Sequence, residues 1–281
     1  MKRKPWSDET RTMAQIREHY GIERELAARL RSASRLDRRS LYTELYNELY
    51  RRVPLHPQLT RKASPEEAMR AVAAQMRLLR PFLGPEVTFL EIGPGDCALS
   101  LEVARSVKQV YGVDVSDMIT SRRDTPPNFR LVLSDGCSIP VPQGTVTVAY
   151  SNQVMEHLHP DDALEQLANI YSALAPGGIY ICITPNRLNG PHDVSRLFDD
   201  VATGFHMKEY TTGELQRLLR GAGFSSARQS VGLKGHDFDL PVPLVAAIES
   251  VLSGLPVGAR NSLSGMPLLR KILGVRLIAA K

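Results

Sequence analysis

A glycine-rich turn between an apolar segment and a helix is the feature that most constrains this fold. Residues 87–92 are mostly apolar, which predicts a buried parallel strand. Gly93 and Gly95 follow, and glycine allows both a tight bend and a close approach of the backbone to a ligand. We expect a helix over residues 96–107 to direct its free N–H groups at that ligand.

A carboxylate at the end of the next apolar segment indicates what the ligand contains. Asp114 ends residues 109–114 and lies nineteen positions after Gly95. A side chain there can accept hydrogen bonds from ribose hydroxyls, so a nucleoside-bearing ligand is predicted. Residues 93–98 also fit the relaxed dinucleotide fingerprint. These residues alone do not distinguish a nicotinamide cofactor from another nucleoside-bearing ligand.

Length and composition bound the class of protein. The chain has 281 residues, 43% of them hydrophobic, enough for one large domain with an appendage or for two small domains. No apolar run approaches the ~18 residues of a membrane span, and the basic start lacks the apolar segment of a signal peptide. The odd number of well-separated cysteines predicts reduced thiols and a cytoplasmic location: Cys97, Cys137 and Cys182.

The positive charge is concentrated near the N-terminus. Residues 1–80 contain 18 Lys and Arg against 10 Asp and Glu, whereas residues 81–281 contain 17 against 20. A solvated helical surface explains such an excess. Contact with an anionic substrate, an anionic membrane surface or RNA is the alternative, but no RNA-binding signature accompanies the charge.

The N-terminal segment is predicted to be helical. We expect helix over residues 8–52, a break at residues 53–57, and a second helix from Pro65 to Leu79 capped by Ser64 and Glu67. The first stretch has an apolar–aromatic face made of Leu41, Leu45, Leu49, Tyr42, Tyr46 and Tyr50. We expect this face to pack on the main domain, with Tyr46 as the candidate to contact a substrate.

Strands and helices alternate after residue 87. This alternation predicts an α/β fold with a parallel sheet and helices on both faces. The predicted strands are residues 87–92, 109–114, 129–134, 145–150, 178–184, 226–233 and 274–280. The predicted helices are residues 96–107, 161–174 and 212–222, the second ended by Pro176-Gly177-Gly178. Residues 234–273 separate the last two predicted strands, and a segment of this length predicts an inserted lid or subdomain.

Further motifs occur in a fixed order along these strands. Glu91 lies inside the first strand, Ser134-Asp135-Gly136 closes the third, residues 151–158 follow the fourth, and residues 174–178 precede the fifth. With these motifs the chain resembles the class I S-adenosylmethionine-dependent methyltransferases, particularly small-molecule enzymes similar to those of quinone biosynthesis. The resemblance covers residues 85–233 and 274–280.

The resemblance implies a fold and a domain organisation. The fold would be Rossmann-like, with seven strands, mostly parallel, and an antiparallel last strand. Residues 1–80 would form a helical extension or cap. Residues 85–281 would form the S-adenosylmethionine-binding domain, with residues 234–273 as an insertion.

The resemblance also implies roles for single residues. The cofactor, S-adenosylmethionine, would be bound by Glu91, Gly93 and Gly95 at the methionine, Asp114 and Val115 at the ribose, Asp135 and Gly136 at the adenine, and Asn152 beside the sulfonium. Structural roles remain open for three of them: a satisfied buried carboxylate for Glu91, a turn cap for Asp135 and a backbone hydrogen bond for Asn152.

Two positions depart from the family pattern. Cys97 replaces the third glycine of the methyltransferase turn, which we expect a small residue to tolerate. Thr147 stands near the position of an acid that the family usually has early in the fourth strand. Neither position belongs to the expected ribose or adenine contacts, so we expect activity to be retained.

A hydroxyl acceptor would need a base. Histidine is the natural base near neutral pH, and we assign His157 and His206 as catalytic candidates. A structural hydrogen bond remains the alternative for His157. Some quinone O-methyltransferases use two glutamates and a histidine in the segment of Glu156 and His157 to bind a divalent ion. Gln153 takes the place of one glutamate here, so we expect no metal.

The substrate side is expected on the long polar loop after the fifth strand. Arg187 and His192 are the substrate candidates there, together with Tyr46. The sequence thus predicts a methyltransferase acting on a small molecule, most simply at a hydroxyl oxygen. The alternatives are a nicotinamide-dependent oxidoreductase, and a non-catalytic protein that binds RNA or an anionic surface through residues 1–80.

Overall fold

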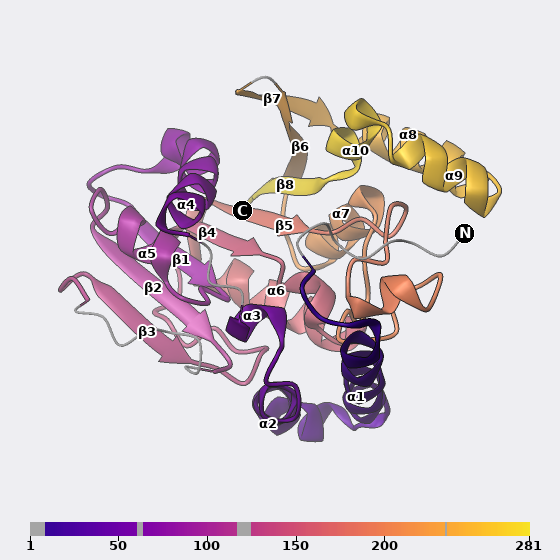
Figure 1. Ribbon diagram of the computed structural model, residues 1–281. Coiled ribbons are helices and arrows are strands. Elements are labelled where there is room, and N and C mark those ends of the chain that lie inside the picture. Colours follow the sequence, from indigo (N-terminus) through magenta and orange to yellow (C-terminus); the bar gives the residue numbers. More distant parts are fainter. Residues whose placement is uncertain (1–8, 61–63, 117–124, 234) are drawn as a thin grey trace.

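One mixed β-sheet organises the molecule (Figure 1). The computed structural model describes residues 9–60, 64–116, 125–233 and 235–281. Within them the sheet has eight strands in the order β3-β2-β1-β4-β5-β8-β6-β7. The strands are β1 (Thr88–Ile92), β2 (Gln109–Asp114), β3 (Phe129–Leu133), β4 (Val146–Asn152), β5 (Leu174–Thr184), β6 (Ser226–Leu233), β7 (His236–Pro241) and β8 (Val275–Ala280).

The strand directions confirm the predicted fold class. Strands β1 to β5 pair in parallel, and β8 runs antiparallel between β5 and β6. The chain order reverses between β1 and β4, and ligands of open α/β sheets bind at the carboxyl ends of the strands at such a point. Seven strands were predicted and the sheet has eight. The additional strand is β7, which pairs with β6 at the edge of the sheet. Its sequence is largely polar and gives no strand signal.

Helices cover both faces of the sheet. Helix α4 (Pro65–Leu79) and α5 (Ala98–Val103) pack on one face, and α6 (Pro160–Ala173) and α7 (Thr212–Gly221) pack on the other. Alternate residues of β1 face the two cores, since Phe89 contacts the first pair of helices and Leu90 contacts the second. Burial on both faces explains why this strand is a nearly continuous apolar run.

The predicted helices are correct in place and differ in length. The capping box of Ser64 and Glu67 begins α4 as predicted. Helix α5 is shorter than the predicted residues 96–107 at both ends. Cys97 takes a left-handed conformation before its start, and residues 104–107 form turns and bends after Val103. The prediction that residues 176–178 end α6 is wrong, because α6 ends at Ala173 and these residues lie in β5.

Two long helices precede the sheet domain. Residues 8–52 do not form one helix, because the chain turns at Ala33 between α1 (Met13–Ser32) and α2 (Arg35–Arg52). A short helix, α3 (Pro57–Thr60), follows the predicted break. Helix α2 buries Leu45 and Leu49 in the main core, which confirms the expected packing of its apolar face.

A buried ion pair attaches α2 to α6. Arg38 donates to both carboxylate oxygens of Asp162, at 2.6 and 2.7 Å, and the two side chains are 4% and 1% exposed. The hydroxyl of Tyr42 donates to the same carboxylate at 2.8 Å and accepts from the backbone N–H of His159 at 2.9 Å. This network holds α2 against the first turn of α6.

The segment between β6 and β8 forms β7 and three helices: α8 (Val242–Ser253), α9 (Val257–Ser264) and α10 (Pro267–Leu273). Helix α8 packs against α7. There Glu249 accepts from the backbone N–H groups of Thr212 and Gly213 at 2.7 and 3.1 Å. Figure 1 shows these helices at the upper right, whereas α2 lies at the bottom. In the parts of the chain that the structure describes, no helix is both long and apolar enough to cross a membrane.

The Arg38–Asp162 pair gives a first prediction. Arg38→Met leaves the Asp162 carboxylate buried without its cation, and breaking a buried pair in this way costs about 3–5 kcal/mol. We expect the free energy of unfolding in urea to fall by that amount. Arg35→Ala is the control, because its pair with Glu165 is largely exposed and contributes little. Equal losses in the two variants would contradict the proposed attachment.

Candidate functional site

The glycine turn after β1 requires glycine for two separate reasons. Gly93 has a φ of +68°, and a Cβ there would lie 2.6 Å from Cγ2 of Val154. Its N–H donates to the carbonyl of Val113 at 2.8 Å, which holds the turn against the end of β2. Cys97 has a φ of +60°. This left-handed conformation explains why glycine suits the position and why cysteine is strained there.

Asp114 ends β2 beside this turn. One of its carboxylate oxygens accepts from the backbone N–H groups of Val115 and Ser116, at 2.7 and 3.2 Å. Burial raises the pKa of the carboxyl above its usual value, while these hydrogen bonds oppose the shift. The side chain is therefore held in one orientation at the carboxyl ends of the parallel strands.

A cavity, here the Asp114 cavity, opens at the carboxyl ends of β1, β2 and β4 and is covered by α2. It brings together seven of the predicted site residues: Gly93, Gly95, Asp114, Val115, Gly136, His157 and Tyr46. These residues come from five separate segments of the chain, so their convergence is a result of the fold.

The far end of the Asp114 cavity is shaped by Gly136 and Tyr42. Gly136 has a φ of +87°, and a Cβ there would lie 2.8 Å from Cδ2 of Tyr42. Gln166 donates to the carbonyl of Gly136 at 2.6 Å and fixes this loop. Tyr42 and Gln166 line the cavity, although the sequence analysis gave neither a site role. For Tyr42 the signal was its place on the aromatic face of α2.

Three predicted cofactor residues do not line this cavity: Glu91, Asp135 and Asn152. Glu91 is 5% exposed and accepts from the hydroxyl of Ser100 at 2.5 Å. Burial raises the pKa of Glu91 to about 8, so the side chain is largely protonated at neutral pH. These contacts agree with the structural role left open for Glu91.

Asp135 is used within its own loop. One carboxylate oxygen accepts from the backbone N–H groups of Cys137 and Ser138, at 3.0 and 2.7 Å, and the other pairs with Arg39 of α2 at 3.1 Å. These contacts match a turn cap. Its neighbour Gly136 is the member of this pair that reaches the cavity. Asn152 is the last residue of β4 and is partly buried.

A second cavity, here the Glu156 cavity, adjoins the first. The two share Tyr46, Gln58, Gln153 and His157. The Glu156 cavity extends between α1, α2 and the loop after β5, and its other polar lining is mostly titratable: Arg11, His19, Glu23, His56, Glu156, His192, Asp193 and His206. Residues that the structure describes between positions 235 and 273 line neither cavity.

His157 lies at the junction of the two cavities. Its Nδ1 is 3.1 Å from the carbonyl oxygen of Phe205. Because a carbonyl only accepts, Nδ1 carries the proton and Nε2 carries the lone pair. Burial lowers the pKa of His157 to about 3, so the ring is neutral at neutral pH. Tyr46 approaches its edge with ring centroids 6.0 Å apart.

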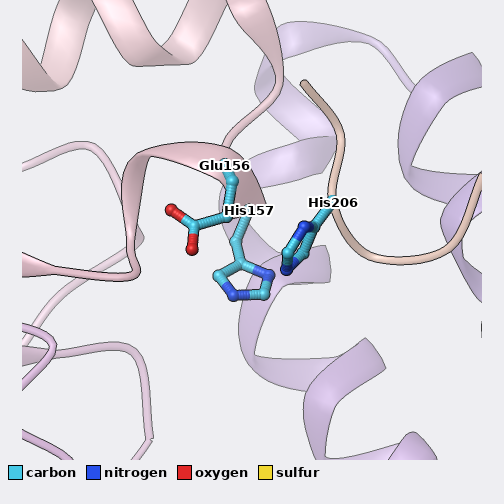
Figure 2. A group of neighbouring side chains, drawn as sticks. All are labelled: Glu156, His157 and His206. Atoms are coloured by element: carbon cyan, nitrogen blue, oxygen red, sulfur yellow. The ribbon is translucent and has the colours of Figure 1, made fainter. Parts of the chain in front are cut away.

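His206 is charged where His157 is neutral. Its Nδ1 donates to Glu209 at 2.7 Å, and this bond raises the pKa of His206 to about 9 against the opposing effect of burial. The rings of His206 and His157 are 4.9 Å apart and nearly perpendicular. Figure 2 shows His206 on a separate segment, with its ring beside that of His157. A protonated imidazole is a poor base, which weakens the catalytic role predicted for His206.

The two remaining substrate candidates separate in space. His192 lines the Glu156 cavity, and Glu209 accepts from both its backbone N–H and its ring, at 2.7 and 3.2 Å. Arg187 instead lies in another cavity and pairs with Glu214 at 3.2 Å. Glu209 was not predicted as a site residue, because its only sequence signal is an acid three residues after a candidate histidine.

Comparison with known proteins identifies the family. Residues 58–228 match the family described as Methyltransferase domain. The chain belongs to this family. It is 29% identical over 136 residues to a probable S-adenosylmethionine-dependent methyltransferase of Mycolicibacterium smegmatis, which covers 48% of this chain and 51% of that protein. The chain thus spans about half the length of the curated relatives that it matches.

Solved structures show the same fold. A chain in the complex of the Haloferax volcanii Trm112 methyltransferase activator with a methyltransferase has a TM-score of 0.53 and 19% identity, over 76% of this chain and 91% of that one. A SAM-dependent methyltransferase from Archaeoglobus fulgidus has a TM-score of 0.50 and 18% identity, over 75% and 94%. The predicted class I methyltransferase family and its Rossmann-like fold are confirmed.

The residues present fit S-adenosylmethionine, the cofactor of this family. The turn at Gly93 and Gly95 offers backbone without a Cβ, and Asp114 offers a fixed carboxylate in the same cavity. Carboxylates and backbone amides suit a ligand with an amino acid end and a ribose. The cofactor prediction is therefore confirmed at the level of the family.

The buried Glu91 gives a second prediction. Its folded-state pKa of about 8 lies above the ordinary glutamate pKa of 4.5, so the folded state holds a proton that the unfolded state releases between these values. The stability that Glu91 contributes is complete below pH 4.5 and falls as the pH rises toward 8.

Glu91→Gln removes this dependence. We expect the variant to match the wild type in urea unfolding at about pH 4 and to exceed it at pH 8 by at least about 1.4 kcal/mol, the equivalent of one pKa unit. Parallel pH profiles of the two proteins would show that Glu91 is ionised in the folded state.

Proposed function

We propose that this protein transfers a methyl group from S-adenosylmethionine to the hydroxyl oxygen of a small molecule. The observation that carries the proposal is the junction at His157, where the Asp114 cavity meets the polar Glu156 cavity. When bound, the cofactor supplies an activated methyl group on a sulfonium. The chain supplies binding, position and exclusion of water.

The cofactor would occupy the Asp114 cavity. Asp114 would accept from the ribose hydroxyls, and the backbone at Gly93 and Gly95 would lie along the methionine portion. Gly136 and the ring of Tyr42 would bound the adenine. Because Tyr42 comes from α2, the N-terminal helices would act as a cap over the bound cofactor.

The acceptor would occupy the Glu156 cavity. This cavity lies under α1, α2 and the loop after β5, and the buried lining groups Glu23, Asp193 and His206 are 5%, 7% and 7% exposed. Such an enclosed site favours a small acceptor. His157 also lines this cavity, and its Nε2 lone pair would receive the proton of an acceptor hydroxyl.

The basic N-terminal segment has a structural explanation. Some of its arginines pair with acidic side chains outside the segment, as Arg38 does with Asp162 at 2.6 Å and Arg39 with Glu165 at 2.7 Å. These pairs offset part of the excess charge. They support the interpretation as a solvated helical surface over that of an RNA-binding surface.

Cofactor binding gives the third prediction. Asp114→Asn removes the charge that accepts from the ribose, and loss of a hydrogen bond to a charged group costs about 1.5–3 kcal/mol. We expect the affinity for S-adenosylhomocysteine, measured by isothermal titration calorimetry, to fall about 10- to 100-fold.

Asp96→Asn is the matched control for Asp114→Asn. Asp96 belongs to the same turn, but it is exposed and does not line the cavity. We expect unchanged affinity in this variant. If wild-type protein binds NADH and does not bind S-adenosylhomocysteine, the proposed function is wrong.

Methyl transfer gives the fourth prediction. His157→Gln keeps a polar group at the junction but removes the lone pair of Nε2. We expect kcat with a hydroxyl acceptor to fall about 10²- to 10⁴-fold, the range of general base catalysis, with little change in S-adenosylhomocysteine affinity. The assay follows labelled methyl from S-adenosylmethionine into matched hydroxyl and amine compounds. Transfer to amines alone would exclude the oxygen acceptor.

A further inference from the structure

We propose that Glu156, His157 and His206 bind a divalent transition-metal ion of the Zn²⁺ class, through one carboxylate oxygen and two imidazole Nε2 atoms. One ligand atom from each of the three residues lies within 4.8 Å of the other two. Figure 2 shows the Glu156 carboxylate on one side of the His157 ring and the His206 ring on the other, with His206 on a separate segment of the chain.

Glu156 carries the first independent observation. The residue is 0% exposed, and its Oε2 accepts from the hydroxyl of Thr184 at 2.8 Å. Its Oε1 is buried and has no hydrogen-bond partner among the described residues. Burying a carboxylate oxygen without a partner costs free energy, because the oxygen loses its hydrogen bonds to water and gains none from the protein. A bound cation supplies the missing partner.

The two histidines carry the second observation. Histidines that bind metals usually donate their other ring N–H to a carbonyl or a carboxylate, which fixes the ring and its tautomer. His157 donates from Nδ1 to the carbonyl of Phe205, and His206 donates from Nδ1 to Glu209. In the neutral ring of His157, Nε2 is thereby left as the ligand atom. His206 is protonated at neutral pH, so its Nε2 becomes a ligand atom when the incoming ion displaces that proton.

The surrounding charges favour a cation. Glu23 and Asp193 line the same cavity and are buried, and the carboxylate of Glu209 lies behind His206. Arg11, which lines the same cavity, is already paired, since it donates to Glu9 at 2.7 and 2.8 Å.

The donor set indicates the kind of ion. Two imidazoles and one carboxylate, with a remaining position open to a cavity, form the pattern of catalytic zinc sites. Magnesium and calcium prefer oxygen ligands throughout, so the set disfavours them. The expectation of no metal considered only the segment of residues 153–157. The third ligand, His206, comes from the loop after β5 and is brought there by the fold.

A bound ion would change the part that His157 plays. As a ligand, its Nε2 would no longer receive a proton, and the ion would instead lower the pKa of an acceptor hydroxyl at the open position. This consequence rests on the proposed function, whereas metal binding itself does not. Metal titration and S-adenosylhomocysteine titration of the same protein therefore separate the two proposals.

The first test uses the whole protein after removal of metal by a chelator and dialysis. Zn²⁺ and Co²⁺ are titrated separately, with calorimetry for stoichiometry and visible absorption for the Co²⁺ complex. We expect one tightly bound ion per chain, a Co²⁺ spectrum typical of nitrogen and oxygen ligands in low coordination, and no comparable binding of Mg²⁺. Absence of stoichiometric Zn²⁺ and Co²⁺ binding would overturn the proposal without any variant.

The second test assigns the ligands. We expect Glu156→Gln and His206→Gln each to weaken Co²⁺ binding by at least about 100-fold, and the positioning variant Glu209→Gln to weaken it about 10- to 100-fold. His236→Ala is the control, because it removes an exposed histidine on β7 and should change nothing.

Folding is checked independently of the metal. His206 and Glu156 do not line the Asp114 cavity, so their variants should keep the wild-type circular dichroism and S-adenosylhomocysteine affinity. Unchanged metal binding in folded Glu156→Gln, or an equal loss in His236→Ala, would show that the ion binds elsewhere. If His206→Gln fails to fold, Co²⁺ binding by the nearly isosteric variant Glu156→Gln tests the proposal.

Discussion

The buried contact of Arg38 and Tyr42 with Asp162 is the interaction on which both cavities depend. It holds α2 against the first turn of α6, and α2 supplies one wall of each cavity. Charges buried this deeply are stabilising only when their geometry is well satisfied, and here both carboxylate oxygens are used. The cap is therefore a fixed part of the site, with a defined position relative to the sheet.

Burial also decides the electrostatics of the site. His157 and His206 are neighbours with similar intrinsic pKa values, yet the pKa of one is lowered to about 3 and that of the other is raised to about 9. The difference comes from their partners, since His157 donates to a neutral carbonyl and His206 donates to the carboxylate of Glu209. Two histidines in one enclosed space can thus hold different charge states.

Much of the fold could be predicted, because burial on both faces leaves a clear pattern in sequence. The strands around Gly93 and Asp114, and the helix capped by Ser64, have strong local signals. Strand β7 was missed because an edge strand needs no apolar run. The length of α5 was overestimated at both ends, and at its start the left-handed conformation of Cys97 has no sequence signal outside glycine.

The sequence by itself determined the glycine turn after β1 and the carboxylate at the end of β2, because both are local features of a strand, a turn and the next strand. It could not determine the acceptor side. There Tyr46, His157 and His206 come from segments far apart in the chain, and only packing of α2 and the loop after β5 against the sheet brings them together. Such side chains can act together only when they are close in space, and the tertiary structure decides whether they are.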